Sequence, residues 1–282
     1  MLNLIRMNLY RICRSFSSWC ILLFTVLAAV FSIAMTNLDI VSMDPSAADA
    51  AADAVQEAPD FGIYVSANPE WADGTIEMGD IVSTELGSRL LAILCTVFTA
   101  IFVTGEQKSG YIKNIAGQFP GRTPLVLSKF AALALWVLLM LLVFTLAVLL
   151  GGLAFWGGNF QMDSVLELLK VLGVQYLLHL GLSSLLMLLC ILTGSSAVGM
   201  AVGILLCCGA GSLIYTLVSR MAESLHAGWS FDLGRYTLDG SIPLAVTGAP
   251  SSVLLRSALV GCLFTGVSVL LSLLTMKKRD IR

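Results

Sequence analysis

Charge is scarce in this sequence, and so are the residues that most enzymes use. Only 12% of its 282 residues are Asp, Glu, Lys or Arg, and the only histidines are His179 and His226. The chain lacks the nucleotide-binding pattern G-x-x-x-x-G-K-[ST], the metalloprotease pattern H-E-x-x-H and the hydrolase pattern G-x-S-x-G. We therefore nominate no catalytic residue and predict that this chain is not an enzyme.

The seven cysteines form no metal-binding or redox pattern. No two have C-x-x-C spacing, the histidines lie far from any thiol cluster, and every cysteine falls in or beside an apolar run. We interpret them as small apolar side chains, and we expect neither a disulfide framework nor a metal site.

The sequence contains several long apolar runs. It is 57% hydrophobic with a mean hydropathy of +0.90, more than a soluble domain of this size can bury. The clearest run, 130–150, has 21 residues without a charge, and a helix of that length matches a bilayer core of about 30 Å. Because polar and apolar residues do not alternate within such runs, the runs are not strands of a membrane β-barrel. We predict an all-α polytopic membrane protein, a single transmembrane domain over 1–282, with spans at 16–35, 82–104, 130–150, 168–192, 197–218 and 253–276.

Residues 1–14 precede the first span and have a helical pattern of their own. Leu2, Ile5 and Leu9 recur at helical spacing, with basic residues among polar neighbours, which predicts a short amphipathic helix in the membrane interface. The alternative is the first part of a cleaved signal peptide. We favour the interfacial helix because the apolar run that follows is long and has no clear A-x-A site.

The distribution of basic residues predicts the orientation. Of the 16 basic residues, three lie in 1–14, four in 104–129 and four in the tail 277–282. By the positive-inside rule, both termini and the loop 105–123 are expected in the cytoplasm of a cell-membrane protein.

Two long connections are then expected outside. Residues 36–81 contain ten acidic residues and no Lys or Arg, so this acidic extracellular loop either attracts a cationic ligand or is simply solvated. Residues 219–252 contain short apolar pieces separated by Gly and Pro, and either a partly re-entrant element or an ordinary surface loop fits them.

The polar and small residues inside the spans each allow two interpretations. Glu85 and Arg89 are four residues apart, as in a helical ion pair, and are either an interfacial pair or contacts on a substrate path. His179 is assigned to a helix–helix hydrogen bond in preference to a proton relay. Gly199 and Gly203 have G-x-x-x-G spacing, which predicts close helix packing within one chain or between two.

Three helix starts and ends can be read from local residues. Ser164 and Glu167 have capping-box spacing, and Thr123 followed by Pro124 is typical of the start of a helix. In the loop 105–123, Gly105 and Gly110 favour turns, 111–119 can form two helical turns, and Pro120-Gly121 ends them. The short helix has an apolar stripe and leaves Lys108 and Lys113 to solvent; the stripe is Tyr111, Ile112, Ile115 and Phe119.

With this topology, the whole chain resembles the permease subunits of ABC-2 type transporters, and especially peptide or antibiotic efflux and immunity permeases. The residues after the second span that resemble the family pattern are Glu106, Gly110, Lys113, Arg122 and Lys129. The long acidic loop departs from the shortest members of that family.

The resemblance implies partners and a mechanism. A separate cytoplasmic ATPase would hold ATP and Mg²⁺, and a second permease subunit, identical or different, would complete the path. Alternating access would export a peptide, an antibiotic or another amphipathic substrate. The implied ATPase-coupling interface is Glu106, Lys108, Gly110, Tyr111, Ile112, Lys113, Ile115, Phe119 and Arg122.

Two other classes of function stay open at this point. A membrane sensor or assembly protein would use the acidic outer loop and would not need the cytoplasmic helix. A membrane-embedded enzyme would need converging polar residues in the spans, for which Glu85, Arg89 and His179 are the candidates. The lipid bilayer is an expected partner of the chain, and nucleic acid is not.

Overall fold

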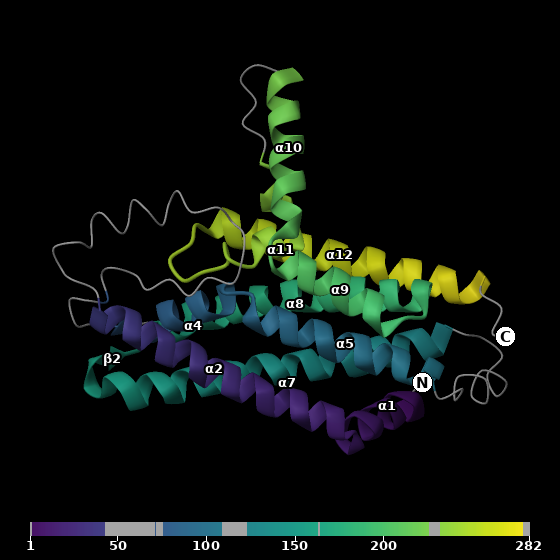
Figure 1. Cartoon of the computed structure of the whole chain (residues 1–282), viewed down its shortest axis with the longest axis horizontal. Helices are drawn as coiled ribbons and strands as arrows, with labels where there is room; N and C mark the ends of the chain where they lie inside the picture. The colour runs from purple at the N-terminus through teal and green to yellow at the C-terminus, as the bar shows by residue number, and fades with distance from the viewer. Residues whose placement is uncertain are drawn as a thin grey trace.

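The computed structural model describes residues 2–42, 71, 76–108, 123–162, 164–225 and 232–278, and it is almost entirely helical (Figure 1). The helices are α1 (Leu2–Arg14), α2 (Phe16–Ser42), α4 (Met78–Gly87), α5 (Leu90–Lys108), α7 (Thr123–Trp156), α8 (Val165–Thr193), α9 (Ser196–Cys207), α10 (Ala210–Leu225), α11 (Leu238–Ser241) and α12 (Ser251–Lys278). Short elements complete the description: the 3₁₀ turns η3 (Gly157–Asn159) and η4 (Leu233–Tyr236), and the strands β1 (Ile76–Glu77) and β2 (Phe160–Gln161).

The helices form a bundle with the composition of a membrane protein. Four of them, α2, α7, α8 and α12, are each long and apolar enough to cross a membrane. The pairs α4–α5 and α9–α10 pass the same test only as bent units, so the described part of the chain has four spans, or six if each bent pair is one. Most of the bundle is elongated in one direction, and α10 stands nearly crosswise to it (Figure 1).

Several helices extend beyond the spans expected from the sequence. α2 continues to Ser42, α7 covers Thr123–Trp156, and α10 continues to Leu225, so these helices extend beyond the limits 16–35, 130–150 and 197–218 expected for the spans. Uncharged runs mark the part of a helix that fits the bilayer core, whereas backbone hydrogen bonding continues into the polar flanks.

The expected continuous span 82–104 is broken. α4 and α5 meet at a 50° bend, where Arg89 has a φ of 66°. This left-handed conformation interrupts a helix, and Ser88 covers the break by donating from Oγ to the carbonyl of Glu85 at 2.6 Å. The span 197–218 is broken in the same way by a 59° bend between α9 and α10, where Gly209 has a φ of 79°.

α9 packs closely against α5 and α8 through its two spaced glycines. A Cβ at Gly203 would overlap Thr96 of α5 and lie 2.9 Å from Leu186 of α8, and a Cβ at Gly199 would overlap the Sγ of Cys190. The close packing therefore occurs within one chain, which is one of the two possibilities that the G-x-x-x-G spacing left open.

The end of the bundle opposite α1 is closed by short elements. β1 and β2 pair in parallel, and the buried helix α11 packs against α8. Gln175 of α8 donates hydrogen bonds to the carbonyls of Ile242 and Ala245 at 2.9 and 3.0 Å. Part of the expected connection 219–252 is thus packed into the bundle, while 219–225 belongs to α10.

Candidate functional site

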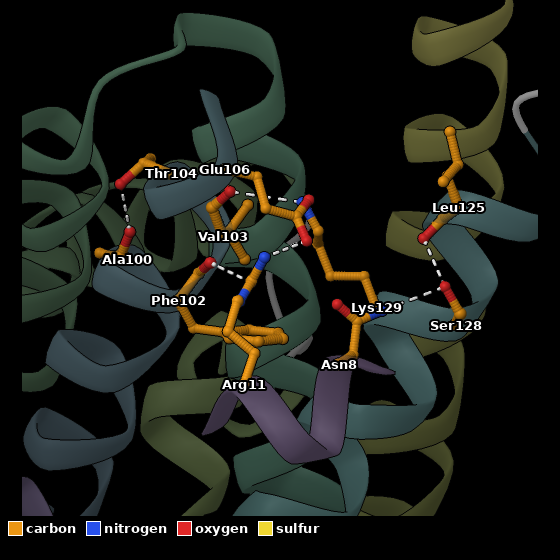
Figure 2. A network of polar contacts seen from close by, with 10 residues as sticks. All are labelled: Asn8, Arg11, Ala100, Phe102, Val103, Thr104, Glu106, Leu125, Ser128 and Lys129. Carbon is orange, nitrogen blue, oxygen red and sulfur yellow. Dashed lines mark hydrogen bonds and ion pairs between the residues drawn. The ribbon is translucent and has the colours of Figure 1, made fainter. Parts of the chain in front are cut away.

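Polar side chains from three helices meet where α1 crosses the ends of α5 and α7 (Figure 2). α1 buries one face, with Leu4, Asn8 and Ile12 four residues apart, which is the spacing of one helical stripe. The other face keeps Arg6 and Arg14 exposed. The amphipathic helix expected over 1–14 therefore exists, and its buried face lies against the rest of the protein.

Glu106, in the last turns of α5, is the centre of this cluster. One carboxylate oxygen pairs with Arg11 of α1, and the other lies 2.6 Å from the Nζ of Lys129 of α7. The side chains of Glu106 and Lys129 are only 8% and 9% exposed, whereas that of Arg11 is 32% exposed. We call these three residues the Glu106 triad. Its two cations and one anion leave it with a formal charge of +1.

Both cations of the triad also contact the end of α5 directly. Arg11 donates from Nη2 to the carbonyl of Phe102 at 3.1 Å, and its guanidinium lies 4.8 Å from the centre of the Phe102 ring. Lys129 donates to the carbonyl of Val103 at 3.4 Å. Because Phe102 stacks on Phe98, Arg11 is fixed against a packed aromatic surface as well as by its ion pair.

A second contact joins α1 to α7 without α5. Asn8 donates from Nδ2 to the Oγ of Ser128 at 3.2 Å, and that hydroxyl donates to the carbonyl of Leu125 at 3.0 Å. The cluster therefore ties α1 to both helices that flank residues 109–122. Any displacement of one of the three helices must carry the others with it or break a buried polar contact.

The structure changes the expected role of Glu106. The sequence placed it on a surface that faces a partner, but the residue is only 7% exposed and its carboxylate is used inside the protein. The turn expected at Gly105 is also wrong, because α5 continues through Gly105 to Lys108. Lys108, another member of the expected coupling interface, is the last residue of α5. The remaining members lie outside the described residues: Gly110, Tyr111, Ile112, Lys113, Ile115, Phe119 and Arg122.

Sequence reasoning did not predict that Arg11 and Lys129 pair with Glu106. One signal existed, because Arg11 directly precedes Ile12 and follows Asn8 by three residues, which places it beside the buried stripe of α1. Nothing local points to a contact between residues 95 positions apart.

The expected pair of Glu85 and Arg89 is not formed, because the break at Arg89 ends α4 and removes the i, i+4 geometry. Glu85 instead accepts hydrogen bonds from Ser32 and, at 2.9 Å, from Thr36 of α2. Arg89 is 6% exposed, and its Nε has no hydrogen-bond partner in the described part of the chain.

Within the described residues, His179 makes no hydrogen bond to another helix, contrary to expectation. Its Nδ1 bonds to the carbonyl of Gln175 in its own helix at 2.7 Å. Its Nε2 is buried without a partner among the described residues. Within those residues no three His, Cys, Asp or Glu side chains gather in a way that could hold a metal ion.

The fold thus has the composition of an α-helical membrane protein, and the cluster fixes α1 to α5 and α7. A family model described as a protein of unknown function, DUF2705, matches residues 68–282, and the chain belongs to this family. No curated protein matches the chain. The matched region includes Glu106 and Lys129 but not Arg11.

Proposed function

We propose that this chain is the permease subunit of an ATP-driven exporter of the ABC-2 type, coupled to a separate cytoplasmic ATPase. The observation that carries the proposal is the Glu106 triad, because it joins α1 to both helices that flank 109–122. An ATPase that moved this segment would act on three helices at once.

The buried position of the triad supports a role in transmission. Lys129 and Arg11 hold the ends of α7 and α5 and the side of α1 together through one carboxylate. A push on 109–122 would therefore be carried into the spanning helices as a joint displacement. The bends at Arg89 and Gly209 are places where such a displacement can change the angle between helix halves.

The proposed assembly also includes an ATPase, a second permease subunit and an exported substrate. ATP and Mg²⁺ would be bound by the partner, a second permease copy or a related subunit would complete the path, and the exported substrate would be a peptide, an antibiotic or another amphipathic molecule. Glu85, Arg89 and His179 would belong to the interior of the protein, where they affect helix packing or the path.

The first experiment tests the partner. The chain is purified in mild detergent together with any ATP-binding protein that accompanies it, and Lys113→Glu is compared with Lys277→Glu. Both variants reverse a basic charge expected on the same side of the membrane, but only the first changes the proposed coupling segment. We expect Lys113→Glu to weaken ATPase association by at least about tenfold and Lys277→Glu to leave it unchanged. An equal, unimpaired recovery of the ATPase with both variants would overturn the proposal.

The second experiment tests transmission without knowing the substrate. Cys13 of α1 is exposed, so a variant that keeps it as the single cysteine can be labelled with a thiol reagent. We expect ATP to change the labelling rate when the ATPase is bound, and Arg11→Gln to remove that change while the ATPase still co-purifies. Transmission through α1 would be contradicted if ATP did not change the labelling rate, or if ATP still changed it in the Arg11→Gln variant.

A further inference from the structure

A cavity of about 620 Å³ lies beside the Glu106 triad, at the corner where α1 turns into α2 and both face α5. Its size is within the range of sites that bind small organic molecules. One wall is apolar and is formed by Ile12, Ile21, Phe98, Ile101 and Phe102. The other side is polar and cationic and includes Arg11, Arg14, Ser15, Ser17 and Ser18.

The polar side of the cavity has unused capacity to bind an anion. Arg14 donates to the hydroxyl of Tyr10 at 2.6 Å, and it has no carboxylate partner among the described residues. Ser18 is only 4% exposed and lines the cavity, so it adds a hydroxyl group to the polar side.

The backbone adds to this capacity. α2 is 27 residues long and begins at Phe16, so the N–H groups of its first turn have no carbonyl of α2 before them to bond to, although that of Ser18 bonds to the carbonyl of Ser15 at 3.2 Å. Positive charge, a helix N-terminus and hydroxyl donors at one place are the features that bind a phosphate group.

The position of the corner determines which phosphate fits. α2 is a candidate membrane span that begins here, and Phe16 and Trp19 are exposed beside it, as aromatic residues commonly are at the membrane–water interface. A free phosphate ion would leave the apolar wall uncovered. A phospholipid would place its phosphate on the polar side and its upper acyl chains along Ile21, Phe98 and Ile101.

We propose that this cavity is a binding site for an anionic phospholipid. The head group lies at Arg14 and the start of α2, and the chains leave between α2 and α5 into the bilayer. Because Arg11 lines the cavity and also pairs with Glu106, an occupied site adds a lipid to the contacts that fix α1. This binding requires no ATPase, so it can be tested even if the proposed transport function is wrong.

Lipid binding can be measured on the full chain in mild detergent by native mass spectrometry. The probes are dioleoyl phosphatidylglycerol and dioleoyl phosphatidylcholine, which share their chains and differ in net charge. We expect tighter retention of phosphatidylglycerol, and a loss of about fivefold in its affinity for Arg14→Gln, the effect of one basic residue at an anionic surface. Arg6→Gln is the matched control, because Arg6 is exposed on the same helix and does not line the cavity.

Three results would overturn the assignment. The two lipids could bind equally, Arg6→Gln could weaken phosphatidylglycerol binding as much as Arg14→Gln does, or millimolar inorganic phosphate could displace the lipid, which would indicate a free-anion site. If Arg14→Gln does not yield folded protein, Ser17→Glu provides the second variant, since it adds a negative charge at an exposed position of the polar side. It should lower phosphatidylglycerol retention and leave phosphatidylcholine retention unchanged, and no effect on phosphatidylglycerol would count against the site.

Discussion

Replacing Glu106 by Gln should destabilise the protein more than replacing Lys129 by Met, although each change removes one charge from the same triad. Glu106→Gln leaves two cations beside each other without an anion, in a place where the lysine side chain is only 9% exposed. Removing one partner of a buried ion pair costs about 3–5 kcal/mol. Lys129→Met keeps the pair of Arg11 and Glu106 and should cost about 2 kcal/mol, the contribution of one charged hydrogen bond.

The double variant tests whether the three charges of the Glu106 triad act together. In the Glu106→Gln background the repulsion between Arg11 and Lys129 is unopposed, so adding Lys129→Met should recover about 1–3 kcal/mol. The assay is equilibrium unfolding in mixed detergent micelles, followed by helical circular dichroism. The exposed Lys170→Met is the control and should change stability by less than about 0.5 kcal/mol. If Lys129→Met destabilises the Glu106→Gln protein as much as it does the wild type, the triad does not act as an electrostatic unit.

Three other variants test separate parts of the structure. Gly203→Val should destabilise the protein by about 1–3 kcal/mol because a side chain there overlaps Thr96, while Gly266→Ala, which has open space around it, should be close to neutral in the same unfolding assay. Arg89→Gly should raise the free energy of unfolding by about 1 kcal/mol, since glycine adopts a φ of 66° without the cost that arginine bears; a loss of stability would show that the Arg89 side chain stabilises the bend. His179→Leu should leave ATP-dependent labelling of the single-cysteine protein intact, and abolished labelling changes would favour a proton relay at this position.

Features governed by neighbouring residues could be predicted from the sequence. The helix start at Ser164 is confirmed, because its side chain accepts a hydrogen bond from the backbone N–H of Glu167 at 3.4 Å. The start of α7 at Thr123 and Pro124 agrees with the same local reasoning. Long apolar runs likewise indicated the helices that can cross a membrane, because hydrocarbon thickness sets the length of a spanning helix.

Features set by tertiary contacts could not be predicted in this way. Gly87 ends α4, but the residue in the left-handed conformation is Arg89 and not a glycine, so the sequence around the break does not predict its geometry. Glu106 was assigned to a coupling surface because it resembles the acidic position of the permease family pattern, yet α1 covers it from a distant part of the sequence. Residues 109–122, which carry most of the proposed coupling interface, lie outside the described part of the chain, so their predicted helix stays a prediction.

The contacts of α1 also have a consequence for how the protein is made. α1 leaves the ribosome before α5 and α7, but Arg11 and Asn8 meet partners that are 95 and 120 residues further along the chain. At about 5–20 residues per second, synthesis of the longer stretch, 120 residues, takes roughly 6–24 seconds. During this interval Asn8 and Arg11 lack these partners, so α1 can form its final contacts only after α5 and α7 have been made. The order in which the helices are made is therefore not the order in which they reach their final places.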